Sequence, residues 1–507
     1  MSDINHDHAT LKLGYIDRRF IWWVIISLFF MRVFFIFQMP YTDTTEARYA
    51  EIARKMVETN DWITPQFDYG VPFWGKPPLH TWVSAAGMKI FGVNHFGGRI
   101  FIFLCCLGLL RILYRWVREQ RGGDYALAGT LVLASSVLFI ASSAMVMTDL
   151  IMTLGTSLAM VGYWKAMKRA SGFKFWGYMF FVGLAIGLLA KGPLAVVIAA
   201  ISIGGWVIAT NRWKATWQNL PWVSGSILML FLTLPWYIAA EVKTPGFLEY
   251  FIIGEHIERF LKSGWQGDLY GSGHAKARGT IWLYWLLMML PWTPFFLITL
   301  PRIGSIIKTM KLQSDGWALY LFCWAIAPLL FFTMATNIIA TYVISGVPAC
   351  AFLIIEAWSI SRQNKMMGDQ GLGKFYRWTA LSSVVILAAG CYLFCFQNPI
   401  AMPKTQKWLA ERIFEIQPAK EAHIYSWKKR CYSLEFYTNG QVQVLNNTAE
   451  LVTILNSPHR DFISIRAGYL NKLPKEMSDN FEIIDTFGLY SLLYEKSNTN
   501  HIITDAK

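Results

Sequence analysis

Charged side chains are scarce in this sequence of 507 residues: Asp, Glu, Lys and Arg together make up 15% of it, while 54% is hydrophobic. A globular protein in water carries more charge than this, so the composition excludes that class. No internal repeat is evident, which argues against the inverted-repeat architecture of many secondary transporters. The sequence predicts a membrane protein of another kind.

Cysteine is also rare, with seven in the chain. Six of the seven fall within apolar runs, and only Cys431 lies in a polar segment. This distribution predicts neither a disulfide framework nor a paired metal–thiolate site.

The net charge of +14 is spread over short loops and is not gathered in one basic domain. A protein that grips a nucleic-acid backbone needs such a domain, so we exclude nucleic acid as a partner. The basic loops are instead expected to face anionic membrane lipids. The first apolar run has no small-residue cleavage site after it, and we interpret it as a retained helix.

Apolar runs of about 20 residues, the length that crosses a bilayer as a helix, recur through most of the sequence. We predict spans near residues 20–38, 97–114, 124–143, 147–164, 175–190, 192–209, 221–239, 279–300, 317–334, 338–358 and 378–396. The expected fold class is an α-helical polytopic membrane protein with about eleven spans, and thirteen as an upper bound.

Basic residues gather in every second connection between these runs. The basic connections are residues 12–19, 111–121, 165–174, 212–214, 302–311 and 362–377. Cytoplasmic loops are the basic ones, so we expect the N-terminus to lie inside. The residues suited to chemistry then lie in the outer connections.

Two outer loops are long, residues 39–96 and 240–278. The first contains amphipathic stretches at 47–58 and 79–91, which we expect to be helices lying in the membrane interface. Together with the spans, these loops make up a transmembrane catalytic domain over residues 1–396.

The composition changes from about residue 397 onward, where charge rises and strand-like runs appear at 422–426, 442–445 and 462–465. Short runs of this kind between helical segments predict a small α/β unit. We therefore expect residues 397–507 to form a soluble domain on the outer side of the membrane.

The first long loop begins with Asp43, Glu46 and Arg48. An Asp followed three residues later by a Glu is a capping-box arrangement, which is the structural interpretation. The functional one is that a carboxylate acts as a base toward an acceptor or binds a metal, because general-base catalysis needs an acidic group within hydrogen-bond reach. These residues alone leave both interpretations open.

Three further charges stand out in the outer connections. Lys76 follows Gly75 and precedes two prolines, and its ammonium suits a phosphate, although a lysine there can also reach toward the headgroups. Asp149 and Lys191 each lie in a short turn between two apolar runs, where an ionisable residue is costly and suggests function. Asp149 can also cap the following helix, and the two charges can pair.

The second long loop contains His256 and Arg259. A single histidine is weak evidence for a metal, whereas a guanidinium can bind phosphate bidentately. Tyr342 follows Asn337 at the outer end of a predicted span.

Taken in this order, these segments resemble the lipid-carrier-dependent glycosyltransferases of the GT-C type. The nearest resemblance is to the aminoarabinose transferases that modify lipid A and to the protein O-mannosyltransferases. It covers about residues 20–350 and rests on 45–51 (TEARYAE), 75–78 (GKPP), Asp149, 191–192 (KG), 256–260 (HIERF) and 341–342 (TY).

The resemblance implies an enzyme of the bacterial inner membrane, with its C-terminal domain in the periplasm. It would transfer a sugar or amino sugar from a polyprenyl-phosphate donor to lipid A, another envelope lipid or glycan, or a protein. The donor's phosphate leaves with growing negative charge, which fixed cations stabilise. The implied catalytic residues are Glu46, Asp43 and Asp149; the implied donor-phosphate ligands are Arg48, Lys76, Lys191, Arg259 and Tyr342; and His256 is the candidate ligand of a divalent metal ion.

Two positions depart from the family pattern. Thr45 stands where the family usually has Asp, so that either Asp43 takes over its role or Glu46 serves alone. Gly75 replaces an acid that is linked to a bound metal in the aminoarabinose transferases. The alternatives to a lipid-modifying enzyme are a protein O-glycosyltransferase, a glycan polymerase or ligase, a lipid-linked sugar transporter or flippase, and an inactive scaffold.

Overall fold

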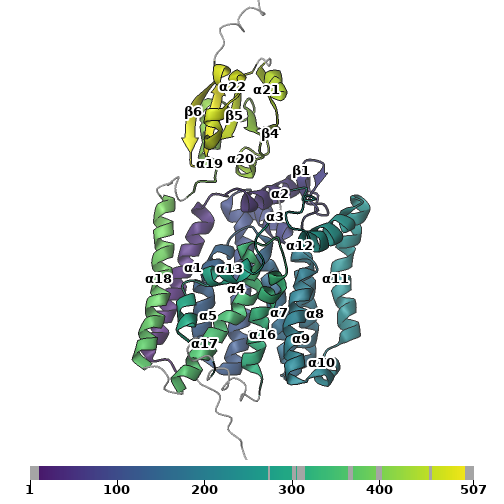
Figure 1. Cartoon of the computed structure of the whole chain (residues 1–507), viewed down its shortest axis with the longest axis vertical. Coiled ribbons are helices and arrows are strands. Elements are labelled where there is room, and N and C mark those ends of the chain that lie inside the picture. The colour runs from purple at the N-terminus through teal and green to yellow at the C-terminus, as the bar shows by residue number, and fades with distance from the viewer. Residues whose placement is uncertain are drawn as a thin grey trace, which may run out of the picture.

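The structure is a computed structural model that describes residues 11–271, 274–299, 304, 315–363, 369–395, 402–455 and 459–496. It consists of a helical bundle with a small sheet domain at one end (Figure 1). We call this end of the bundle the domain side. The predicted basic connection 302–311 lies, apart from residue 304, outside the described residues, as does part of 362–377.

Helices occupy the places of the predicted spans, and the short α10 lies between two of them. They are α1 (Tyr15–Gln38), α4 (His95–Arg121), α5 (Gly123–Ser135), α6 (Val137–Ser142), α7 (Thr148–Met167), α8 (Phe173–Lys191), α9 (Leu194–Thr210), α10 (Trp213–Asn219), α11 (Trp222–Lys243), α13 (Thr280–Met288), α14 (Thr293–Thr299), α16 (Trp317–Thr333), the 3₁₀ helix η3 (Ala340–Gly346), α17 (Val347–Gln363) and α18 (Asp369–Cys395).

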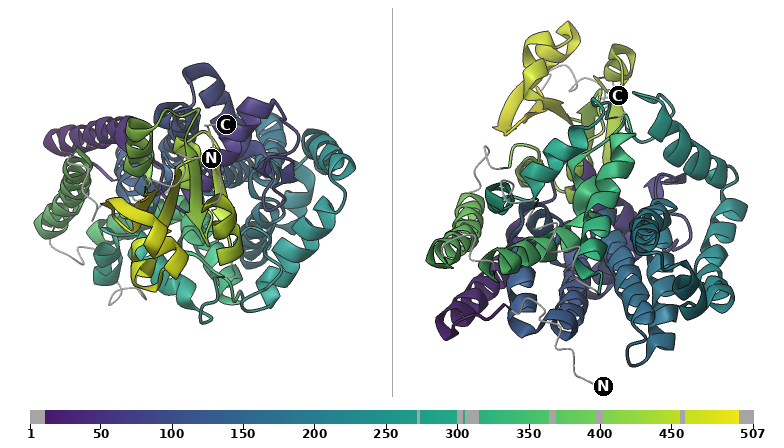
Figure 2. Two further views of the ribbon diagram at one scale, coloured as in Figure 1. Left: turned by 90° about the horizontal axis from the view of Figure 1, so that it is seen from above. Right: turned by 60° about the horizontal axis from the view of Figure 1, so that its bottom comes forward.

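Five helices among the described residues are long and apolar enough to cross a membrane: α1, α4, α8, α11 and the continuous segment Ala340–Ile360. The expected helical membrane protein is thereby confirmed, while the count of eleven spans stays a prediction. The predicted span 279–300 is divided into α13 and α14, because Pro291 and Pro294 interrupt the backbone hydrogen-bond ladder. In Figure 2 helix α11, in teal, lies at the edge of the bundle, where it packs against α8.

The first long loop folds against the domain side of the bundle. It contains α2 (Thr45–Thr59), the short strands β1 (Gln66–Asp68) and β2 (Val71–Pro72), and α3 (Leu79–Phe91). Both predicted amphipathic helices therefore exist. Most of α2 is buried within the protein, and an interfacial position for these helices stays a prediction. The second long loop forms a π-helix, η1 (Glu249–Glu258), and one turn of helix, α12 (Arg259–Leu261).

The C-terminal domain is built on one five-stranded sheet in the order β4-β3-β5-β7-β6. Its elements are α19 (Lys407–Ile416), β3 (His423–Trp427), α20 (Tyr432–Tyr437), β4 (Val442–Leu445), α21 (Thr448–Leu455), β5 (Asp461–Arg466), η4 (Ala467–Lys472), α22 (Lys475–Asn480), β6 (Phe481–Phe487) and β7 (Tyr490–Glu495). The three predicted strands are β3, β4 and β5, which are parallel, whereas β6 and β7 are antiparallel additions.

Alternating side chains of this sheet bury two separate cores. Phe462 on β5 packs under α19, whereas its neighbour Ile463 packs on the opposite face with α21 and α22. This is the period of two that a strand imposes. The domain is therefore an α/β unit with helices on both faces.

Helix α20 attaches this domain to the first loop. The hydroxyl of Tyr437 accepts a hydrogen bond from the backbone N–H of Tyr41 at 2.7 Å and lies 2.7 Å from Nε2 of His95. Lys55 of α2 lies 3.6 Å from Glu435 of α20. Because these contacts are polar and specific, α20 holds a defined position over α2 (Figure 1).

Candidate functional site

Two adjoining cavities lie between the two long loops on the domain side. The first, which we call the polar cavity, has a volume of about 440 Å³. It is lined by Thr44, Thr45, Arg48, Tyr49, Phe67, Phe73, Gly75, Lys76, Glu255, Arg259, Asp268, Tyr270, Gly271, His274, Lys429, Arg430 and Tyr432. The C-terminal domain thus supplies part of its wall.

The second cavity, which we call the apolar groove, has a volume of about 330 Å³. It is lined by Lys76, Lys191, Pro193, Leu194, Val197, Ile252, Glu255, His256, Ile257, Arg259, Phe260, Phe331, Phe332, Asn337 and Tyr342. The two cavities share Lys76, Glu255 and Arg259, so a charged cluster stands where an apolar channel meets a polar one.

Glu255 organises this shared cluster. Its two oxygens lie 2.8 Å from Nζ of Lys76 and 2.8 Å from Arg259. Burial raises the pKa of Glu255, but the charges of Lys76 and Arg259 outweigh burial and lower it to about 2. The carboxylate is therefore ionised and holds both cations at the mouth of the groove.

A second buried pair, Asp149 and Lys191, lies beside the groove. Oδ1 of Asp149 is 2.6 Å from Nζ of Lys191, and that ammonium lies 4.6 Å from the ring centroid of Tyr342. Lys191 and Tyr342 line the groove, whereas Asp149 contacts it through Lys191. Asp149 is therefore placed to orient the lysine.

Small residues bring this pair together. Asp149 begins α7 and Lys191 ends α8, and the two helices pack so closely that a Cβ at Gly155 would approach backbone atoms of α8 to 2.7 Å. A Cβ at Gly183 would approach α7 to 2.5 Å. Glycine permits this contact between helix backbones. The start of α7 and the end of α8 therefore lie side by side, and Asp149 and Lys191 meet there.

His256 does not fit a metal site. Its Nδ1 lies 2.7 Å from the carbonyl oxygen of Phe251 and its Nε2 lies 3.3 Å from that of Lys191. The adjacent Glu255 is already shared by two cations. No group of three or more metal-ligating side chains occurs among the residues that the structure describes. His256 instead joins the π-helix to the end of α8.

Asn337 fixes the turn that carries Arg259. Its amide donates to the carbonyl oxygens of Arg259 at 2.6 Å and Lys262 at 2.7 Å, and its oxygen accepts from the N–H of Gly264 at 3.2 Å. These three bonds hold α12 in place, so the guanidinium of Arg259 faces both cavities.

Arg48 lines the polar cavity and is held by neighbours on two sides. Its guanidinium donates to the carbonyl oxygen of Tyr270 at 2.6 Å and lies over the rings of Tyr49 and Tyr432. It is thus positioned by the second loop and by the C-terminal domain at once.

Asp43 and Glu46 lie elsewhere. Oε1 of Glu46 accepts from Arg99 at 2.8 Å and from the N–H of Val146 at 3.2 Å, and this buried carboxylate lines neither cavity. Asp43 accepts from the N–H and hydroxyl of Ser433 at 3.0 and 2.6 Å. Both contacts tie the first loop to its surroundings, and a catalytic role for either carboxylate stays a prediction.

The polar cavity contains two carboxylates that the sequence did not single out, Glu255 and Asp268. Asp268 lies 3.4 Å from Arg259. The spacing of Glu255 and Arg259, four residues apart, was a usable signal, because such pairs share one helix face. Thr45 lines this cavity with a hydroxyl where the family usually has an acid.

Comparison with known proteins finds similar sequences and similar folds. Residues 18–251 match the family model for dolichyl-phosphate-mannose-protein mannosyltransferases. The undecaprenyl phosphate-alpha-4-amino-4-deoxy-L-arabinose arabinosyl transferase of Erwinia tasmaniensis is 30% identical over 318 residues, which are 61% of this chain and 54% of that protein. Its counterpart in Edwardsiella ictaluri is 29% identical over 343 residues, 66% of this chain and 58% of that protein. The chain thus spans about half the length of these curated relatives.

Solved structures show the fold. The crystal structure of ArnT from Cupriavidus metallidurans bound to undecaprenyl phosphate is similar, with a TM-score of 0.72 at 16% identity, covering 95% of this chain and 98% of that one. The archaeal oligosaccharyltransferase AglB from Archaeoglobus fulgidus gives a TM-score of 0.51 at 10% identity, with 90% and 70% covered.

The described residues form a helical membrane protein whose fold is similar to that of ArnT from Cupriavidus metallidurans. The chain is similar in sequence to the aminoarabinose transferases and, over residues 18–251, to the protein mannosyltransferases, which confirms the expected resemblance.

Proposed function

We propose that this protein transfers a sugar of the aminoarabinose class from a polyprenyl-phosphate donor to lipid A. One observation carries the proposal: Lys76, Lys191 and Arg259 converge at the head of an apolar groove. An isoprenoid tail needs an apolar channel, and its phosphate needs fixed cations at the end of that channel. The names of the relatives support the same donor and sugar class.

In the proposed complex the tail lies along Leu194, Val197, Phe331 and neighbouring groove residues, and the phosphate meets the shared cluster. The sugar then projects into the polar cavity, where the acceptor enters. The bond between the sugar carbon and the phosphate oxygen breaks, and a bond from that carbon to the acceptor oxygen forms. The cations stabilise the charge that develops on the departing phosphate.

Glu255 is the base that this geometry favours for a hydroxyl acceptor. With no donor bound, Lys76 and Arg259 lower its pKa to about 2, which makes it a poor base. A donor phosphate would draw both cations away, and burial then raises the proton affinity of the carboxylate. Binding of the donor would thus activate the group that accepts the acceptor's proton.

The orientation we propose places the C-terminal domain in the periplasm of a bacterium and the N-terminus in the cytoplasm. Basic residues such as Arg118 and Arg121 end helix α4 at the far end of the bundle, whereas Asp149 and Lys191 lie on the domain side. Positive residues favour the cytoplasmic face. We also propose residues 1–396 as the transmembrane catalytic domain and 397–507 as the outer domain.

A protein acceptor is the second candidate, because the matched family model describes protein mannosyltransferases. The two candidates differ in acceptor only. Purified protein would be given a labelled polyprenyl-phosphate sugar with lipid A in one sample and a serine- and threonine-rich peptide in another. Label on lipid A supports the proposal, label on the peptide supports the second candidate, and label on neither contradicts both.

A matching experiment in cells uses mass spectrometry of the lipid A fraction. Deleting the gene should remove a mass increment of one sugar, which the intact gene restores and Asp149→Asn does not. Lipid A that is unchanged by the deletion would contradict lipid A as the acceptor.

A further inference from the structure

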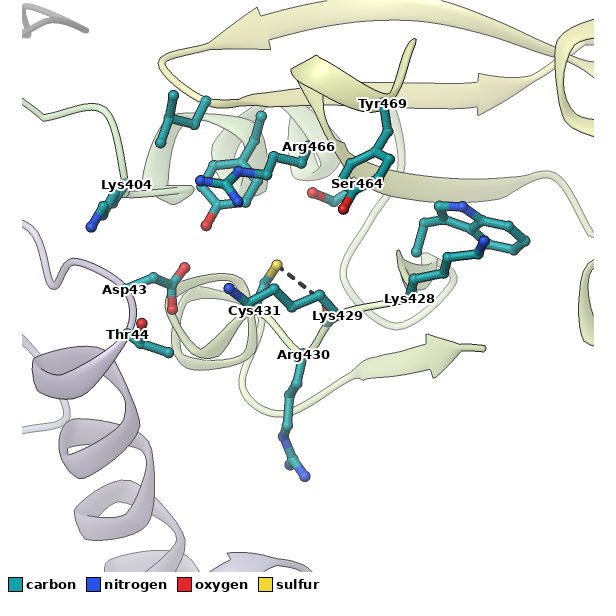
Figure 3. Close-up of a pocket in the computed structure, with 13 residues that line it drawn as sticks. Asp43, Thr44, Lys404, Lys428, Lys429, Arg430, Cys431, Ser464, Arg466 and Tyr469 are labelled. Atoms are coloured by element: carbon teal, nitrogen blue, oxygen red, sulfur yellow. Dashed lines mark hydrogen bonds between the residues drawn. The ribbon is translucent and has the colours of Figure 1, made fainter. Parts of the chain in front are cut away.

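A third cavity, of about 240 Å³, lies where the C-terminal domain meets the first loop (Figure 3). It opens where two parallel strands end, because Trp427 is the last residue of β3 and Arg466 is the last of β5. In α/β sheets, ligands bind in the crevice outside the carboxyl ends of such strands. We call this the strand-end cavity.

Positive charge dominates its lining. The cationic residues are Lys404, Lys428, Lys429, Arg430 and Arg466, and the one carboxylate is that of Asp43. Figure 3 shows Arg430 directed away from the others, and it is held by Asp68 at 2.9 Å and by Glu435.

The other four cations make no ion pair with any residue that the structure describes. Lys404, Lys428, Lys429 and Arg466 are all exposed. The oxygens of Asp43 already accept two hydrogen bonds from Ser433, so one carboxylate faces four cations. Like charges gathered around one cavity repel each other, and a bound anion relieves that repulsion.

The strand-end cavity adjoins the candidate active site. Thr44, Lys429 and Arg430 line both the strand-end cavity and the polar cavity. A ligand that is anchored at the strand ends therefore lies next to the space where the acceptor reacts. At the rim, Tyr469 is exposed and offers an aromatic face suited to a sugar ring.

We propose that the strand-end cavity binds a phosphate group carried by a phosphorylated sugar, and that the acceptor glycolipid supplies it. Phosphate is the anion that clustered Lys and Arg side chains recognise. The assignment of this phosphate to the acceptor glycolipid rests on the proposed function. The assignment of a phosphate to the cavity does not. The domain would then anchor the acceptor while the membrane bundle binds the donor.

The test uses the full chain in lipid nanodiscs and the variant Lys404→Ala/Arg466→Ala, because these two residues line the strand-end cavity and neither the polar cavity nor the apolar groove. The matched control is Lys475→Ala, an exposed cation on α22 of the same domain. Binding is measured with lipid A that retains its phosphates, with dephosphorylated lipid A, and with inorganic phosphate. A thermal unfolding curve checks that each variant is folded, and the two single variants replace the double one if it is not.

We expect the double variant to bind phosphorylated lipid A about tenfold more weakly, as loss of charge-assisted hydrogen bonds predicts, with a raised acceptor KM and no change in the control. Tighter binding of phosphorylated than of dephosphorylated lipid A supports the glycolipid source. Binding of inorganic phosphate alone overturns that source and leaves a phosphate site. Equal affinity for phosphorylated lipid A in the double variant and in the control overturns the strand-end cavity as a phosphate site.

Hydrolysis of the donor without acceptor separates this inference from the proposed function. If the wild-type protein cleaves no donor but the double variant still loses phosphate affinity, the proposed function fails and the strand-end site stands. If donor cleavage is normal and phosphate affinity does not change, the strand-end site fails and the proposed function stands.

Discussion

Lys76 and Glu255 form an ion pair of 2.8 Å although 179 residues separate them in the sequence. The pair joins the first long loop to the second, and Arg259 completes it on the other carboxylate oxygen. Two cations suited to a donor phosphate are thus held by a carboxylate that would compete with that phosphate. The first three predictions concern this cluster and its neighbour.

Lys76→Ala should chiefly impair use of the donor, because it removes one cation from the head of the groove. We expect the donor KM to rise by about tenfold, the cost of one hydrogen bond to a charged group, and the acceptor KM to stay unchanged. Steady-state kinetics with a labelled donor measures both. Lys89→Ala, an exposed lysine of α3, is the control, and equal donor KM values for the two variants would contradict the assignment.

Asp149→Asn should reduce transfer by about a hundredfold while the protein remains folded. Losing one group that stabilises charge in the transition state typically costs this much. The reason is that Asp149 holds Lys191 at 2.6 Å beside the groove. The control is Glu119→Gln, which removes the 2.7 Å pair with Lys165 near the other end of α7. Near-normal turnover of Asp149→Asn would show that Lys191 needs no positioning partner.

Glu255→Gln should lower the donor KM several-fold, because a neutral amide competes less with phosphate for Lys76 and Arg259. It should also lower kcat toward a hydroxyl acceptor by about a hundredfold, the typical contribution of a general base. A merely structural role would not move the two constants in this way. Glu255→Asp should restore part of kcat, and a variant with raised KM and unchanged kcat would refute the proposed base.

Asp43 should make the attachment of the C-terminal domain depend on pH. Burial raises its pKa from 3.8 to about 6, despite the hydrogen bonds from Ser433 and the charge of Lys429. Because the pKa of Asp43 is raised in the folded state, its protonated carboxyl stabilises the fold. This contribution to stability is complete below about pH 3.8 and is lost as the pH rises through about 6.

Thermal unfolding measured between those pH values should therefore show Asp43→Asn losing part of the pH dependence of the wild type. Asp485→Asn, an exposed carboxylate on β6, should keep it. Parallel stability curves for wild type and Asp43→Asn would contradict the raised pKa.

Chelation should leave transfer unchanged, because both ring nitrogens of His256 face carbonyl oxygens and Glu255 is occupied by two cations. The measurement is turnover before and after dialysis against EDTA. Loss of activity that Mg²⁺ or Zn²⁺ restores would show a metal requirement and reopen the assignment of His256.

Much of the bundle could be predicted from the sequence, because spans are defined by runs of apolar residues and short basic connections. Lys76, Lys191, Arg259 and Tyr342 were also predicted together, and the structure brings them to one groove. The strands β6 and β7 were not predicted. Much of β6 is exposed and Glu482 and Asp485 interrupt its apolar residues, whereas β5 is buried over five consecutive residues.

The role of single carboxylates could not be predicted. Asp43 and Glu46 have the spacing of a capping box, yet their partners are Ser433, which is 390 residues away, and Arg99. Glu255 was visible as a neighbour of His256, but its two cations come together only in the folded chain. Long-range pairing of this kind leaves no periodic signal in a sequence.

Residues 428–432 lead from the end of β3 into the first residue of α20, and this stretch borders both the strand-end cavity and the polar cavity. It belongs to the C-terminal domain, and the orientation that we propose places its side chains outside the constraints that a bilayer imposes on the bundle. Relatives with the same donor chemistry could therefore diverge in what they glycosylate by changing five residues here. Exchanging this stretch would alter the surroundings of the acceptor and leave the lining of the apolar groove unchanged.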